Sequence, residues 1–260
     1  MKKHLLNNKI VLMALLLCTL LLCGCGAGGE TSSQATPSPT QAALLAPTPE
    51  PKPVAGGTLR LSMPVNADTK NPLAVNTEEM LVFYSLIYEG LIAIDNTGML
   101  IPSLAETWTS DETGKVWTLK LRSAACWQDT GTPVTAMDVA NTFAQIQQLG
   151  AEGYYSYALE RIDAIEPGEN GTVVVTMKNA GLASLYALDF PIVQAGFAAA
   201  DQQAAGTGPY KIKTISDYRA VLTANPSWWR ESPYIETIEF YPRDSNEIAI
   251  ASFVAGQLDM

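Results

Sequence analysis

The sequence predicts an α/β domain with mixed sheets and flanking helices over residues 56–260. Three observations predict this class. Short segments that alternate apolar and polar residues are separated by turn signals, two longer segments carry apolar residues at helical spacing behind a capping residue, and the content of 47% hydrophobic and 16% charged residues is typical of a globular protein. Ahead of this domain we expect two further regions, residues 1–24 and residues 25–55.

The first of these regions has the pattern of a secretory signal. Residues 1–9 carry three lysines, and residues 10–22 form an uncharged apolar stretch of 13 residues. That length suits the core of a signal peptide and is short for a bilayer span, which makes an uncleaved membrane anchor the weaker alternative. We therefore predict a leader over residues 1–24.

Cys25 is the predicted attachment point for lipid. The tetrapeptide at residues 22–25 is Leu-Cys-Gly-Cys, so Cys25 follows the small Gly24, whereas Cys18 and Cys23 each follow a leucine. This segment resembles the bacterial lipobox, with Cys23 at a position where Ala or Ser is more usual. The resemblance implies that Cys25 is acylated, becomes the first residue of the mature chain and anchors it to a membrane.

Residues 25–55 read as a tether. After Cys25 the chain has six prolines, few charges and no apolar periodicity. Such a segment mixes flexible and polyproline character and can reach at most about 90 Å when fully extended.

The folded region opens with a predicted strand and helix. In "GGTLRLSMP", Leu59, Leu61 and Met63 fall on one face. After a polar loop, Asn76 is the predicted N-cap, with Glu79 completing a capping box and Gly90 ending the helix. The apolar positions at helical spacing are Met80, Phe83, Tyr84, Ile87 and Leu91.

Two hairpins follow. The first turns at Asp111 to Gly114, and its second strand directs Trp117, Leu119 and Leu121 inward while the residues between them, and Arg122, face outward. The second turns at Asn170-Gly171 before the alternating "TVVVTMK".

Between and after the hairpins we predict more helices and strands. Thr135 caps a helix with Asp138 in its first turn, and its buried stripe is Val139, Phe143 and Ile146. Strands are expected in "GPYKIKTISDYRAVLTAN" and "YIETIEF", and a last helix is expected behind a capping box of Asp244 and Glu247.

Charge and residue types exclude several functions. The 26 acidic residues all follow position 24 and meet only 13 basic residues there, a net charge of −13 that disfavours nucleic acid as a partner. The single histidine is His4 in the leader, which excludes His-based catalytic and zinc sites from the mature chain. We expect no metal and no cofactor, and we expect Cys126 to be an unpaired, largely buried thiol.

Five segments together resemble one family. They are "LAETWTSDETGKVWTLKLR", "DTGTPVTAMDVANTF", "GTGPYKI", "NPSWWRESPYIETIEF" and "FVAGQLDM", in this order over residues 57–260. This arrangement resembles the extracytoplasmic solute-binding proteins of peptide, opine and nickel ABC importers, the oligopeptide-binding class or solute-binding family 5. Thr130 and Gln128 depart from the usual pattern of the loop they share.

The resemblance implies a fold, a function and partners. The fold is a periplasmic-binding-protein-like (type II) lobe. The function is that of a lipid-anchored component that captures peptides or similar polar solutes, with a metal chelate or an oligosaccharide left open, and delivers them to ABC permease subunits. The location is the outer face of the cytoplasmic membrane or the periplasm. Since the resembling proteins continue past the segment "FVAGQLDM" into a second large lobe, the chain is expected to hold only one side of the cleft. Alone, it is expected to bind solute weakly or not at all, to leave apolar inter-lobe surface exposed and to associate.

Most of the shared motifs are interpreted as structural. Gly206 and Gly208 shape a turn, and the Trp228-Trp229 pair caps a strand end. Ligand candidates come from loops that face the cleft in the resembling proteins. They are Asn76, Thr77, Met80, Tyr154, Tyr155 and Phe190.

Two other function classes stay open at this stage. One is a sensor or adhesin on the same fold, since fold does not fix function. The other is a carboxylate-based hydrolase, which the 26 acids permit although no pair among them stands out.

Overall fold

A computed structural model describes residues 52–64, 71–75, 77–197 and 205–260. Residues 51–260 form one compact unit. The predicted leader, the lipid attachment at Cys25, nearly all of the tether and the candidate ligand residue Asn76 lie outside the described residues.

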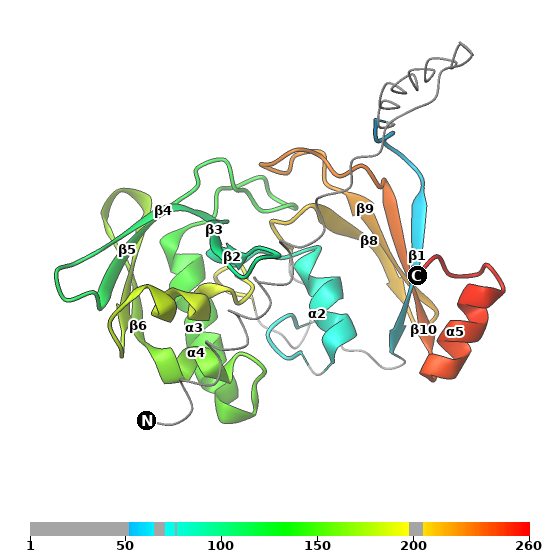
Figure 1. Cartoon of the computed structure of the whole chain (residues 1–260). Helices are drawn as coiled ribbons and strands as arrows, with labels where there is room; N and C mark the ends of the chain where they lie inside the picture. Colours follow the sequence, from blue (N-terminus) through cyan, green and yellow to red (C-terminus); the bar gives the residue numbers. More distant parts are fainter. Residues whose placement is uncertain (1–51, 65–70, 76, 198–204) are drawn as a thin grey trace, which may run out of the picture. The chain divides into compact units, whose positions relative to one another are not determined.

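One four-stranded sheet joins the beginning of the unit to its end (Figure 1). Its strands lie in the order β1 (Thr58–Pro64), β10 (Thr237–Arg243), β9 (Arg219–Ala224) and β8 (Tyr210–Ser216). The strand β1 runs parallel to β10, and the other pairs are antiparallel. The prediction of strands in these segments and of a mixed sheet is confirmed.

The second four-stranded sheet is antiparallel throughout. Its order is β4 (Ala105–Ser110), β5 (Val116–Leu121), β7 (Thr172–Met177) and β6 (Ile162–Pro167). A separate two-stranded sheet pairs β2 (Ile92–Ile94) with β3 (Leu100–Pro102).

Both predicted hairpins are present. The β4–β5 turn places Gly114 at φ 69°, and the β6–β7 turn places Asn170 at φ 51° and Gly171 at φ 74°. Left-handed backbone is what Asn-Gly provides at low cost, so the turn sequence itself sets the pairing of β6 with β7.

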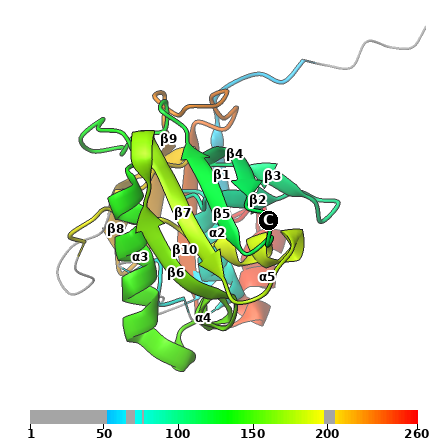
Figure 2. The same ribbon diagram turned by 90° about the vertical axis from the view of Figure 1, so that its left-hand side faces the viewer.

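The helix α3 (Ala136–Leu149) packs along β6 and β7 (Figure 2). Its predicted capping box is confirmed, because the Thr135 hydroxyl accepts from the Asp138 amide while Asp138 accepts from the Thr135 amide. The predicted buried stripe of Val139, Phe143 and Ile146 is at most 3% exposed. It meets the buried face of the sheet, which includes Trp117, Leu119, Leu121, Val173 and Val175.

The Asp138 carboxylate also joins its helix to the segment around Ala195. Its Oδ1 accepts a 2.6 Å hydrogen bond from the amide of Ala195, and its Oδ2 accepts from both the amide and the hydroxyl of Thr135. We expect Asp138→Ala to lower the free energy of unfolding by about 2–3 kcal/mol, because a nearly buried acceptor of three hydrogen bonds is lost. Urea titration checks this against Asp217→Ala in an exposed turn, which we expect to cost at most about 0.5 kcal/mol. Equal midpoints for the two variants would contradict it.

The helix α2 (Glu78–Ser85) is shorter than predicted and starts at a different cap. Its N-cap is Thr77, whose hydroxyl accepts from the Met80 amide, so the prediction of Asn76 as cap is wrong. The helix ends before Ile87 because the backbone carbonyls that follow it accept hydrogen bonds from other strands and loops. Leu86 and Ile87 accept from the amides of Tyr210 and Gly208, and Glu89, Gly90 and Leu91 accept from Ile192, Leu104 and Ala105.

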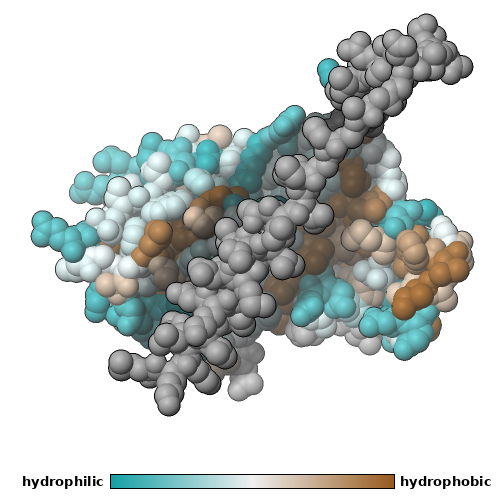
Figure 3. Space-filling view, in the orientation of Figure 1, coloured by the Kyte–Doolittle hydropathy of each residue, from teal (hydrophilic) through white to brown (hydrophobic). Residues whose placement is uncertain are grey.

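The helix α5 (Asn246–Val254) is capped by Ser245, whose hydroxyl accepts from the Ile248 amide, so the predicted cap at Asp244 is wrong by one residue. Figure 3 shows an apolar surface over this helix. Its exposed apolar residues are Ile248, Ile250, Phe253 and Val254, the last 78% exposed.

The remaining helical turns are short. They are η1 (Gly150–Glu152), α4 (Ser156–Arg161), η2 (Glu169–Gly171) and η3 (Leu182–Leu188). The turn α4 leads directly into β6, and η3 leads into the segment that returns past α3.

Gly206 and Gly208 are required by close packing. A Cβ on Gly206 would lie 1.8 Å from the carbonyl oxygen of Ile87, and one on Gly208 would lie 2.8 Å from the same atom. Gln128 secures this crossing, because its amide donates to Gly206 while its side chain donates to the carbonyls of Gly208 and Tyr210. Gln128 differs from the residue usual at this position in the resembling proteins, and it therefore has a structural role here.

Cys126 is a free thiol among the described residues, as predicted, but it is only half-buried. It sits in an isolated bridge with Pro133, between the buried side chains of Ala125 and Trp127. The alternation along this segment turns the side chains of its neighbours fully inward and leaves the thiol partly exposed.

Candidate functional site

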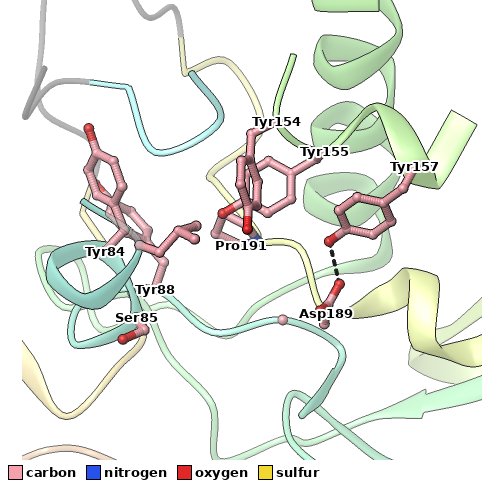
Figure 4. A pocket seen from close by; sticks show the side chains of 10 residues that line it. Tyr84, Ser85, Tyr88, Tyr154, Tyr155, Tyr157, Asp189 and Pro191 are labelled. Carbon is pink, nitrogen blue, oxygen red and sulfur yellow. Dashed lines mark hydrogen bonds between the residues drawn. The ribbon is translucent and has the colours of Figure 1, made fainter. Parts of the chain in front are cut away.

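A cavity of about 300 Å³ lies beside α2, α4 and the segment after η3. In Figure 4, Tyr84, Ser85 and Tyr88 stand on one side, and Tyr154, Tyr155 and Tyr157 stand on the other, with Pro191 between them. We call this cavity the tyrosine pocket. Its lining residues are Leu81, Tyr84, Ser85, Tyr88, Gly90, Tyr154, Tyr155, Tyr157, Asp189 and Pro191.

The tyrosine rings are held by edge-to-face contacts with one another. The centroid separations are 5.1 Å for Tyr154 and Tyr155, 6.1 Å for Tyr155 and Tyr157, and 6.0 Å for Tyr84 and Tyr88. Four of the five are buried or half-buried, whereas Tyr154 is 48% exposed at the pocket edge. A fixed set of aromatic walls with polar tips is typical of sites that bind small polar molecules.

Asp189 supplies the formal charge of the pocket. Its Oδ1 accepts a 2.5 Å hydrogen bond from the Tyr157 hydroxyl (Figure 4). Burial raises the pKa of the Asp189 carboxyl, and the hydrogen bond from Tyr157 opposes that shift. Burial and the neighbouring Asp189 together raise the pKa values of Tyr155 and Tyr157, so both phenols are neutral at physiological pH.

The two sides of the pocket are tied together at its floor. Gly90 lies so close to Asp189 that an added Cβ would be 2.7 Å from its carbonyl oxygen. Next to it, the Glu89 carbonyl accepts from the Ile192 amide at 3.0 Å. The segment 189–192 is thus fixed against the end of the α2 region, which positions the Asp189 side chain at the cavity.

The Glu89 side chain points to a different cluster. It accepts from the Trp229 indole at 2.9 Å, and burial raises the pKa of its carboxyl. The guanidinium groups of Arg122 and Arg230 lie 4.1 Å and 4.3 Å from the Trp229 ring centroid. Trp229 therefore packs between two arginines beyond the end of β9, and Arg122 covers this ring instead of facing solvent freely.

The structure brings together only some of the predicted ligand residues. Tyr154 and Tyr155 line the pocket. Thr77 serves as the cap of α2 and is not among the lining residues, while Met80 and Phe190 are both 0% exposed and belong to the core. Met80 is buried because the face of α2 that carries it packs inward with Phe83.

Sequence reasoning missed Tyr84, Tyr88, Tyr157 and Asp189. Tyr84 belongs to the predicted helical stripe, and that pattern assigns it to the core, whereas Tyr88 was not named at all. Asp189 precedes the predicted Phe190 by one residue, and the tyrosine content of "GYYSY" was the available signal for Tyr157. What no pattern provides is the approach of these separate segments.

Within residues 52–260 apart from the gaps given above, no group of three or more His, Cys, Asp or Glu side chains is placed to hold a metal ion. Over the same residues no helix has the length and apolarity that crossing a membrane requires.

Comparison with known protein families identifies the family of this chain. Residues 99–260, more than half of the chain, match the model of the bacterial extracellular solute-binding proteins, family 5 (middle region). The chain belongs to this family. The α/β fold predicted for a periplasmic-binding-protein-like lobe is confirmed by the solved structures as well.

Two curated relatives show the range of the family. The chain is 26% identical over 209 residues to the nickel-binding periplasmic protein of Escherichia coli, covering 76% of this chain and 39% of that protein. It is 29% identical over 211 residues to the periplasmic oligopeptide-binding protein OppA of Haemophilus influenzae, covering 70% of this chain and 39% of that protein. The chain therefore spans about two fifths of the length of these relatives.

Solved structures share the fold. The oligopeptide-binding protein AppA of Bacillus subtilis, in complex with a nonapeptide, superposes with a TM-score of 0.69 at 22% identity, covering 80% of this chain and 44% of that one. NikA of Brucella suis, in complex with Fe(III)-EDTA, gives a TM-score of 0.67 at 23% identity, covering 78% of this chain and 42% of that one.

Proposed function

We propose that this family 5 protein is the solute-binding component of an ABC importer, which captures peptides or similar polar solutes outside the cytoplasm and delivers them to permease subunits. The observation that carries the proposal is the family match, because it spans residues 99–260 and so includes Tyr154, Tyr155, Tyr157 and Asp189 of the tyrosine pocket. The named relatives bind nickel or oligopeptides, which supports capture without chemical conversion.

The side chains that line the pocket support a binding function over hydrolysis. Its described lining residues contribute one carboxylate, Asp189, whereas glycoside hydrolysis uses two that face one bond. Aromatic walls with hydroxyl tips bury the apolar parts of a solute and accept or donate hydrogen bonds to the rest.

Lipid anchoring at Cys25 and a tether over residues 25–55 complete the proposal. An acylated cysteine holds the protein at a membrane, and the proline-rich segment lets the binding unit reach its permease. The proposed location is the outer face of the cytoplasmic membrane or the periplasm.

Filling the pocket tests the proposal without removing core residues. Ser85 is exposed, lies at the end of α2 and lines the pocket, whereas Val82 is exposed on the same helix and does not line it. We expect Ser85→Trp to weaken solute binding about tenfold or more, because the indole occupies space that the solute needs, and Val82→Trp to leave binding unchanged.

The measurement is equilibrium dialysis of the purified chain against peptides from a casein digest, quantified by mass spectrometry. Retention of peptides by the wild-type and Val82→Trp proteins, and its loss in Ser85→Trp, is the expected result. Equal retention by all three proteins would overturn the proposed function.

A further inference from the structure

The sheet that contains β1 has one covered edge and one open edge. Its two outer strands are β1 and β8 (Figure 1). Beyond β1, the Arg60 amide donates to the Asp259 carboxylate, and the Asp259 amide donates to the Arg60 carbonyl. Beyond β8, residues 212–215 form backbone hydrogen bonds with no described residue outside β9. An edge of this kind is a row of backbone donors and acceptors to which another strand can pair.

The direction of the open backbone groups follows from their neighbours. Tyr210 directs its backbone away from β9, because its amide donates to the Leu86 carbonyl and its carbonyl accepts from the Gln128 side chain. Since this direction alternates along a strand, Ile212 directs its amide and carbonyl to the same side. The register with β9 then shifts at Lys213, which forms a β-bulge. The edge is thus occupied at the start of β8 and open from Ile212 onward.

A cavity of about 460 Å³ lies beside this open edge. It is lined by residues 211–215 of β8 and by Ile87, Gln128, Asp129 and Ala205. We call it the β8 groove. It shares no lining residue with the tyrosine pocket. A strand that is added to a sheet needs an unpaired edge and space beside it for side chains, and the β8 groove provides both.

The formal charge of the β8 groove is positive. Lys211 and Lys213 line it, and neither takes part in an ion pair formed by described residues. Asp129 is the acidic residue of the lining, and its Oδ1 already accepts from the Thr130 amide and the Gln194 side chain. Two such lysines in a chain of net charge −10 favour a partner that carries carboxylates.

We propose that the β8 groove docks an extended acidic segment of a partner protein, which adds to the four-stranded sheet beside β8. Its backbone pairs with the open edge from Ile212 onward, and carboxylates at alternate positions pair with Lys211 and Lys213. A second copy of this chain is disfavoured, because a symmetric pair of β8 edges brings lysines against lysines and the bulge interrupts the ladder. The groove is separate from the tyrosine pocket, so the proposal goes beyond solute capture.

Three hexapeptides test the groove, each with a blocked carboxyl terminus and the same dye at its amino terminus. TEVEVT is the acidic probe, TKVKVT has the opposite charge, and the third probe is TEVEVT with its central amides N-methylated. Fluorescence polarisation with the purified chain measures their affinities. We expect TEVEVT to bind about tenfold more tightly than TKVKVT, because its carboxylates meet the two lysines. The N-methylated probe should not bind, because it lacks the donors that pair with a strand edge.

A charge swap assigns this preference to the two lysines. The double variant Lys211→Glu/Lys213→Glu should lose binding of TEVEVT and gain binding of TKVKVT, and the gain shows that the variant is folded. Lys52→Glu/Lys115→Glu makes the same change of charge at exposed positions outside the groove, and it should keep the wild-type preference. Ser85→Trp, which fills the tyrosine pocket, should keep that preference as well.

Several outcomes would overturn the proposal. They are equal binding of TEVEVT and TKVKVT, undiminished binding of the N-methylated probe, failure of all three probes, and a preference for TEVEVT that survives the charge swap. Loss of TEVEVT binding in Ser85→Trp would assign the peptide to the tyrosine pocket instead. A wild-type dimer in which cross-links join Lys211 or Lys213 of two copies would assign the edge to a second copy. Peptide retention in the dialysis experiment tests solute capture separately and is unaffected by these results.

Discussion

Gly206→Ala is expected to lower the free energy of unfolding by about 4 kcal/mol or more, enough to unfold a domain of ordinary stability. The added Cβ would lie 1.8 Å from the Ile87 carbonyl oxygen, which is backbone and cannot rotate away as a side chain would. The same carbonyl accepts from the Gly208 amide, and the Gly206 carbonyl accepts from Gln128. Relief of the clash would therefore break the contacts that join β8 to the end of α2.

Gly98→Ala is the matched control for this substitution. Gly98 has φ 82° with nothing near its missing Cβ, so alanine there meets backbone strain alone. That strain is expected to lower the free energy of unfolding by about 1 kcal/mol. Urea titration followed by tryptophan fluorescence compares the two variants, and similar midpoints for Gly206→Ala and Gly98→Ala would show that the close approach to Ile87 is not required.

Cys25→Ser is expected to release nearly all of the protein from the membrane fraction. Acyl chains contribute about 0.8 kcal/mol per buried methylene, and two or more chains hold a protein at a membrane far more firmly than one. A serine at position 25 cannot enter the thioether bond that the lipobox resemblance implies, so this anchor is lost entirely.

Cell fractionation and metabolic labelling with a fatty-acid probe measure this effect. Cys23→Ser is the control, because it changes the other cysteine of the Leu-Cys-Gly-Cys segment and should leave both labelling and membrane association intact. If Cys25→Ser still carries the label and Cys23→Ser does not, the attachment point is Cys23 and the lipobox assignment is incorrect.

The local elements were predictable because their signals lie within a few residues of one another. Asn170-Gly171 provides two left-handed residues and so makes the β6–β7 hairpin, and Thr135 with Asp138 closes the capping box of α3. The alternation of Trp117, Leu119 and Leu121 similarly predicts which face of β5 is buried.

Predictions failed where a distant segment competes for the same backbone. The apolar spacing through Leu91 predicts a long helix, but α2 ends at Ser85 because the carbonyls of Leu86 and Ile87 accept from Tyr210 and Gly208. Helical periodicity describes which side chains are buried, and Ile87 and Leu91 are indeed buried, yet it does not identify the partner of each carbonyl.

The sequence by itself determined the fold class, the family resemblance and the positions of the hairpins and of α3, since each depends on local pattern or on ordered motifs. Only the tertiary structure decided the pocket. It buries Met80 and Phe190 in the core and brings Tyr84, Tyr154 and Asp189 to one cavity from three separate segments. The physical reason is that a pocket is formed by the packing of Gly90 against Asp189 and the hydrogen bond from Ile192 to Glu89, contacts between residues about a hundred positions apart that leave no periodic signal in the chain.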